Sequence, residues 1–241
     1  MGKHRDFTVQ LDNFHHEVGA VARFVYADMA VQHAASRSER LLARLNRTPE
    51  FWLAHAAACQ SAGYVALGRI FDKTSPFNIG KLLDSFEANF ALFSRAALAE
   101  RKREGKPDDP PWLTEYLDDA YYPTTKDVRY LRERVRKYRS IYDRAIKPAR
   151  NKYLAHRERV GSQGQNLFGR GTVRELWRLV TFLVSFDQAL WQQLHNGRKP
   201  VIRVSRYSVK AIYDATSQSS SPHELITGQT KALMLLIEAM P

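Results

Sequence analysis

Apolar residues recur at helical spacing along most of this 241-residue chain. Near the N-terminus, Phe14, Val18, Val21, Val25 and Met29 lie three or four positions apart, which places them on one face of a helix. Similar patterns, read with their start and stop signals, predict helices over roughly 10–35, 49–71, 79–104, 124–146, 172–194 and 222–239, with shorter helices near 112–122 and 207–215.

Capping residues and helix breakers divide the pattern into elements. Thr48 stands before a proline, Asn78 can cap the next helix, and Thr124 opens a capping box with an Asp three positions later. The segment Gly105–Pro111 is a clear breaker. Pro148 must interrupt or kink the helix before it, or begin a fresh segment, because proline lacks the backbone donor that a helix interior needs.

These elements predict an all-α protein, an antiparallel bundle of about five main helices over residues 10–197 with a helical C-terminal extension over 198–241. Val201–Val204 is the only stretch that could form a strand, and it is too short to imply a sheet. The apolar runs fall far short of the roughly 20 residues that span a bilayer. With a single cysteine, Cys59, no intrachain disulfide can form, so we expect a soluble protein of the reducing cytoplasm.

The positive charge of the chain is concentrated in one segment. The formal net charge is +12, and residues 126–159 hold thirteen Lys and Arg residues against four Asp and Glu residues. A local excess of this kind attracts phosphate backbones, although a solvated helix face has the same appearance in a sequence.

Candidate chemistry lies at the end of this basic segment, in the run Arg150-Asn-Lys-Tyr-Leu-Ala-His156. A metal-free ribonuclease needs groups that move protons at the 2′-hydroxyl and at the leaving 5′-oxygen, and His156 can do either at neutral pH. Arg150 matches phosphate geometry, and Asn151 can orient the ribose or the phosphate. Six positions on a regular helix leave two side chains about 120° apart. A distorted segment, the length of the arginine, or a second copy across a dimer is therefore needed to bring Arg150 and His156 together.

This run resembles the signature of the HEPN superfamily, an Arg followed by a polar residue and then, after four to six intervening positions, a His. The interval here is five. The neighbourhood also resembles the AbiU-like branch, named for abortive-infection phage resistance, whose members carry an upstream Asp-containing loop followed by a helix. Residues 69–83, with Asp72, match that feature, and the resemblance covers roughly residues 10–195.

The resemblance implies a homodimer in which two copies of the motif line one cleft. It also implies a metal-independent endoribonuclease that leaves 2′,3′-cyclic phosphate ends and acts as a toxin or phage-defence effector. His156 would be the acid/base residue, Arg150 would hold the scissile phosphate and Asn151 would support them. No metal or cofactor is expected, RNA is the expected substrate, and an antitoxin protein is a possible partner. The expected RNA contacts are the flanking basic residues Arg144, Lys147, Lys152 and Arg157.

Other interpretations stay open at this point. Some HEPN proteins bind a nucleotide, RNA or a partner protein without cutting RNA, so the fold does not settle activity. A basic helical DNA regulator is a third class, although the sequence lacks a persuasive helix-turn-helix. His15, His16 and Glu17 could suggest a metal site, but adjacent helix residues point to different sides. Asp72 could reach the cleft, although anchoring its own loop is the more common role of such a residue.

Overall fold

A computed structural model describes residues 7–105, 108–151, 173–204, 208–215 and 221–240. Within these ranges the chain is helical and contains no β-strand, so the all-α prediction is confirmed. The elements are α1 (Phe7–Ala35), α2 (Glu39–Leu45), α3 (Pro49–Phe71), α4 (Ile79–Ala88), the 3₁₀ turn η1 (Phe90–Phe93), α5 (Arg95–Arg103), α6 (Leu113–Asp119), α7 (Thr125–Ile141), the π-helical turn η2 (Tyr142–Ile146), α8 (Lys147–Ala149), α10 (Val173–Asn196), α11 (Val209–Asp214) and α12 (Pro222–Ala239).

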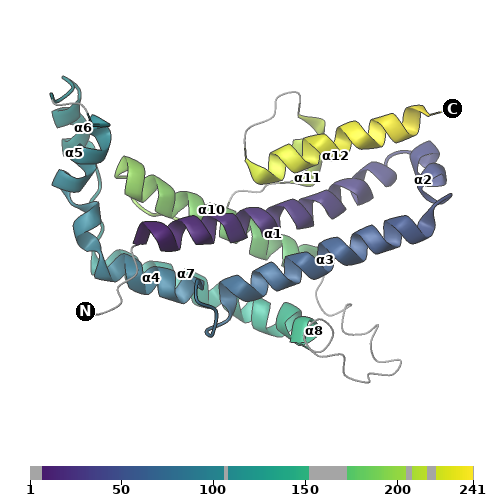
Figure 1. Ribbon diagram of the computed structural model, residues 1–241, viewed down its shortest axis with the longest axis horizontal. Coiled ribbons are helices and arrows are strands. Elements are labelled where there is room, and N and C mark those ends of the chain that lie inside the picture. Colours follow the sequence, from purple (N-terminus) through teal and green to yellow (C-terminus); the bar gives the residue numbers. More distant parts are fainter. Residues whose placement is uncertain (1–6, 106–107, 152–172, 205–207, 216–220, 241) are drawn as a thin grey trace.

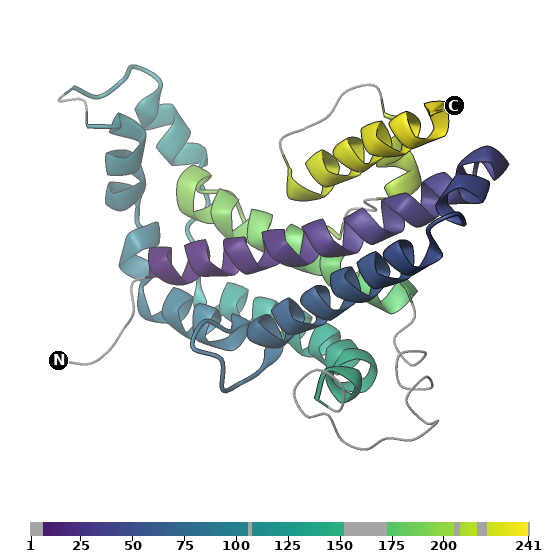
Figure 2. The ribbon, with the colours of Figure 1, turned by 45° about the vertical axis from the view of Figure 1, so that its right-hand side comes forward.

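The long helix α1 runs through the middle of the bundle (Figure 1). It packs against α3, α10, α12 and α4, while α4 also packs against α7. After the rotation in Figure 2, α10 is seen crossing behind α1, with α12 and α3 on either side of α1. Helices α5 and α6 project at one end, and they form a small apolar cluster of their own.

Buried aromatic rings hold the central helices together. Phe14 of α1 meets Phe186 of α10 edge to face at 5.7 Å between ring centroids. Tyr138 of α7 stacks on Phe182 of α10 at 3.9 Å with an interplanar angle of 5°. Phe14, Phe182 and Phe186 are nearly inaccessible to solvent. Since burial of a large apolar side chain contributes about 1.5–3 kcal/mol, these contacts fix how α7 and α10 lie against α1.

The single helix predicted over 79–104 is wrong, because the chain forms α4, η1 and α5 there. Asn89 leaves the helical conformation (φ −120°, ψ 36°), and its side-chain amide donates to the Ser85 carbonyl at 2.7 Å. Ser94 then caps α5 by accepting from the Ala97 N–H at 3.2 Å. Asn and Ser side chains compete with helical backbone bonds in this way, which ends one helix and starts another.

Two smaller predictions also need correction. Thr48 occupies the N-cap position of α3, but its side chain makes no capping hydrogen bond there. The possible strand at Val201–Val204 is irregular backbone, in which the Val201 N–H donates to the Lys199 carbonyl at 2.8 Å. The capping box at Thr124 is present as predicted, with Asp127 as its carboxylate. Thr172, at the predicted start of the next helix, lies outside the described residues.

The C-terminal helix α12 lies along α1 and reaches α2 (Figure 1). The Ser38 hydroxyl donates to Glu238 at 2.5 Å, and Arg40 donates to the Met240 carbonyl at 3.2 Å. These contacts place α12 on the same bundle as α1. The boundary drawn between 10–197 and 198–241 stays a prediction.

Candidate active site

Arg150 and Asn151 follow directly after α7, η2 and α8 and are the last described residues of this segment. His156 lies outside the described residues, as do Lys152 and Arg157. The convergence of Arg150 and His156 therefore stays a prediction, and the geometry that can be described is that of the first two residues of the motif.

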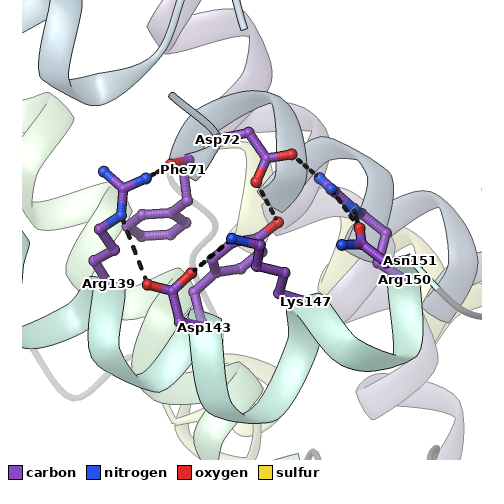
Figure 3. A network of polar contacts seen from close by, with 8 residues as sticks. Phe71, Asp72, Arg139, Asp143, Lys147, Arg150 and Asn151 are labelled. Carbon is purple, nitrogen blue, oxygen red and sulfur yellow. Dashed lines mark hydrogen bonds and ion pairs between the residues drawn. The ribbon is translucent and has the colours of Figure 1, made fainter. Parts of the chain in front are cut away.

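The Arg150 guanidinium forms an ion pair with the Asp72 carboxylate (Figure 3). Its Nη2 and Nε also donate to the Asn151 side-chain oxygen, at 2.7 and 3.1 Å. The side chains of Arg150 and Asp72 are only 18% and 20% exposed. Because a partly buried charge pair is screened little by water, this contact fixes the direction of the arginine far better than a surface pair would.

Asp72 is the residue at which α3 ends. It takes an extended conformation, so its carboxylate leaves the helix and faces η2 and α8. The Tyr142 hydroxyl donates to the second Asp72 oxygen at 3.0 Å. The Tyr142 ring stacks on Phe71 with 5.1 Å between ring centroids, and Arg139 donates to the Phe71 carbonyl at 2.6 Å. Arg139, Tyr142 and Arg150, all from the basic segment 126–159, thus contact the end of α3.

Burial raises the pKa of the Tyr142 hydroxyl, and the Asp72 carboxylate beside it acts in the same direction, while Arg150 opposes both. The hydroxyl therefore stays protonated at neutral pH and serves as a donor to Asp72. One Asp72 oxygen thus accepts the hydrogen bond from Tyr142, and the other pairs with Arg150.

The π-helical turn η2 explains how Tyr142 and Arg150 reach the same carboxylate. The Lys147 N–H donates to the Tyr142 carbonyl, five residues back, instead of the usual four. Pro148 follows at once and has no N–H for a regular helical bond. Eight residues of regular helix would leave Tyr142 and Arg150 about 80° apart around the helix axis. The π-helical turn takes up one residue, so the rotation corresponds to seven residues and the two side chains are only about 20° apart. The interruption predicted at Pro148 takes the form of this turn.

Gly68, on the last turn of α3, leaves the space in which Arg150 lies. A Cβ atom placed on Gly68 would stand 1.9 Å from Arg150 Nη1 and 2.9 Å from its Cδ and Cζ atoms. These distances are too short for any side chain, so the arginine crosses α3 at this point because residue 68 has none. Gly68 and Tyr142 are two residues of the site that sequence reasoning missed.

Two of the predicted RNA-contacting residues, Arg144 and Lys147, lie among the described residues, and each is paired with a carboxylate. Arg144 is 68% exposed and lies 2.6 Å from Glu175, and Lys147 lies 3.5 Å from Asp143. The Lys147–Asp143 pair is exposed at both residues, and such pairs contribute about 0–1 kcal/mol and exchange readily. In the other pair Glu175 is only 17% exposed, but the Arg144 side chain itself stays open to contact with phosphate. The same helix presents further exposed basic residues at positions 126, 129, 136 and 137.

His15 and Glu17 of α1 contact different neighbouring helices, as their spacing predicts. His15 lies 2.7 Å from Asp187 of α10, and Glu17 lies 2.7 Å from Arg69 of α3. The hydrogen bond to Asp187 raises the pKa of His15, while burial raises the pKa of Asp187. These contacts tie α1 to two neighbouring helices on different sides.

Comparison with known families gives one match that covers most of the chain. Residues 5–212 match the sequence model of the HEPN family AbiU2. The chain belongs to the AbiU2 family of HEPN proteins. The suspected HEPN, AbiU-like relationship is thereby confirmed. Neither the curated proteins nor the solved structures gave a match.

Among the described helices, none combines the length and the apolar character that crossing a bilayer requires.

Proposed function

We propose that this AbiU2-family protein is a metal-independent endoribonuclease that acts as a toxin or abortive-infection effector. The observation that supports this most is the fixed Arg150, which three partly buried contacts hold next to an open cavity at the start of the HEPN motif. Orienting a cation before the substrate arrives is the way enzymes stabilise charge that develops on phosphorus oxygens.

In the proposed reaction, the ribose 2′-oxygen attacks phosphorus and the bond from phosphorus to the 5′-oxygen breaks. The 2′-hydroxyl loses its proton to a base and the leaving 5′-oxygen gains one from an acid, giving a 2′,3′-cyclic phosphate and a 5′-hydroxyl. His156 supplies the proton transfer, Arg150 stabilises the negative charge, and Asn151 supports the arginine. A homodimer would place two copies of the motif in one cleft and supply a second histidine.

A second function is favoured by one specific contact. The Arg150 guanidinium already has Asp72 and Asn151 as partners, so a phosphate must compete with a carboxylate for it. A protein that binds a nucleotide, RNA or an antitoxin without cutting RNA would tolerate that arrangement. The two functions differ in whether product forms.

The test is incubation of the purified protein with total RNA and transfer RNA in EDTA, beside the His156→Ala variant. We expect cleavage by the parent with cyclic-phosphate ends and at least a hundredfold slower cleavage by His156→Ala, the loss typical of a missing acid/base group. His16→Ala is the matched control, because His16 is an exposed histidine on α1. Equal cleavage by a folded His156→Ala variant would refute the mechanism, and RNA binding without product from the parent would favour the second function.

A further inference from the structure

The helix α7 carries a row of basic residues on the face that points away from the core. Lys126, Arg129, Arg136 and Lys137 are all exposed. Because each residue of a regular helix is rotated by about 100° from the one before, these four side chains fall within an arc of about 100°. The buried residues of α7 lie on the opposite side of the helix. We call the four residues the basic ridge, which extends roughly 17 Å along the helix axis.

The positive charge of the basic ridge is not cancelled by neighbouring acids. None of its four side chains pairs with a carboxylate of the described residues. Asp84 and Glu87 of α4 approach α7, but both pair at 2.8 Å with Arg132, which lies outside the ridge. Glu133 is the one acid on the same face, so four cations and one carboxylate leave a net charge of +3. Such a surface attracts a polyanion.

The polar character of this face indicates which polyanion it fits. Between residues 126 and 137, the arc of the ridge holds Glu133 besides the four cations and contains no apolar or aromatic residue. A protein partner is usually held by an apolar or aromatic centre, and single-stranded RNA by aromatic rings on which bases stack. A double helix keeps its bases stacked inside and presents its phosphates outward, so cations alone are enough to contact it.

The basic ridge and Arg150 lie on different sides of the same helical segment. Tyr142 is buried, and Arg150 reaches the same Asp72 carboxylate as Tyr142 does. The ridge faces away from that buried side. A phosphate on the ridge is therefore not the one beside Arg150, and the ridge contacts a part of the RNA outside the cleft.

We propose that the basic ridge of α7 binds the phosphate backbone of a double-helical arm of the substrate RNA, outside the cleft that holds the scissile phosphate. This inference rests on the proposed ribonuclease function of the site at Arg150. It adds the substrate class, which is folded RNA with a paired arm beside the bond that is cut. Because phosphate contacts position a nucleic acid without reading its sequence, the sequence of the arm is unimportant.

The test measures binding of a fluorescent RNA hairpin, and of an unpaired RNA of the same length, by fluorescence anisotropy between about 50 and 200 mM salt. All proteins carry His156→Ala, so that the RNA stays intact. The ridge variant adds four changes, Lys126→Gln, Arg129→Gln, Arg136→Gln and Lys137→Gln. The control variant removes the same charge at four exposed positions outside α7, by Arg47→Gln, Arg198→Gln, Arg203→Gln and Lys210→Gln. Since all these positions are exposed, helical circular dichroism should be unchanged in both variants.

We expect the ridge variant to bind the hairpin at least tenfold more weakly than the parent at about 0.1 M salt. The plot of log affinity against log salt concentration should become shallower by about 3–4, because each phosphate contact contributes about 0.9 to its slope. The control variant should keep the affinity within threefold and the slope within about one contact. The parent should bind the hairpin at least tenfold more tightly than the unpaired RNA.

Three results would overturn the inference: equal weakening by the ridge and control variants, equal binding of paired and unpaired RNA, and hairpin binding that the ridge changes leave as it was. Binding of a DNA duplex as tight as that of the RNA hairpin would also overturn the assignment to RNA. Cleavage is measured separately with His156 present. Hairpin binding that depends on the ridge, without cleavage, would support the ridge and count against the ribonuclease. Cleavage together with unchanged binding by the ridge variant would overturn the ridge and leave the ribonuclease proposal standing.

Discussion

Replacing Gly68 with alanine tests how Arg150 is held. The new Cβ would stand 1.9 Å from Arg150 Nη1, so the guanidinium must leave Asp72. Separation of a well-buried pair costs 3–5 kcal/mol and of an exposed pair about 0–1, so a pair with exposures of 18% and 20% should cost roughly 2–3 kcal/mol. Alanine in a helix gains about 0.5–1 kcal/mol over glycine, which leaves a net destabilisation of about 1–2.5 kcal/mol.

Thermal denaturation followed by circular dichroism measures this change. For a chain of this size, about 1–2.5 kcal/mol corresponds to a fall in Tm of about 2–10 °C. Gly63→Ala is the matched control on the same helix, because a Cβ there would meet only Val25 Cγ2 at an ordinary 3.6 Å. The control should keep or raise the Tm. If Gly68→Ala proves as stable as Gly63→Ala, the arginine is not held between Gly68 and Asp72. If the chain cuts RNA, Gly68→Ala and Arg150→Ala should both lose activity.

Three further changes test other contacts. Tyr142→Phe removes the hydroxyl that donates to Asp72 but keeps the ring, so the free energy of unfolding in urea should fall by about 0.5–1.5 kcal/mol, and no change would show the bond to be unimportant. The hydrogen bond to Asp187 raises the pKa of His15, so the folded chain holds a proton that the unfolded chain releases. The stabilisation from this pair is complete below the ordinary His value of 6.5 and is lost as the pH rises through the raised pKa of His15. Urea titrations across this window should show a smaller loss in Asp187→Asn than in the parent, and equal slopes would contradict the pairing. Arg132→Ala removes two exposed ion pairs and should cost no more than about 1 kcal/mol in the same assay, so a larger loss would show that Arg132 supports the core.

The helical fold could be predicted from local patterns in the sequence. Apolar residues at helical spacing marked α1, and a proline after Thr48 marked the start of α3. The split of 79–104 was missed because no glycine or proline stands between residues 81 and 104. That Asn89 ends a helix is shown only by its backbone conformation and its bond to Ser85. Propensity describes the average behaviour of a residue type, whereas this break depends on one side-chain contact.

The sequence singled out Arg150 and Asn151 by their spacing to His156, and it marked Asp72 as a residue that could reach the cleft. It did not show that Asp72 pairs with Arg150, because the two residues lie 78 positions apart in the chain. Tyr142 would have been placed on another face by regular helix geometry. A Gly four residues before an Asp, at the end of a helix, is a signal that could have been noticed. It gains meaning only from the structure, in which Arg150 lies against Gly68 and pairs with Asp72.

The π-helical turn has a consequence for how this chain should be compared with its relatives. It behaves as a one-residue insertion between Tyr142 and Arg150 that is absorbed without a loop. A relative with an ordinary helix here should be one residue shorter, and an alignment without a gap would pair its arginine with a neighbour of Arg150. Counting the interval from the tyrosine to the arginine therefore separates members that keep this turn from members that have lost it.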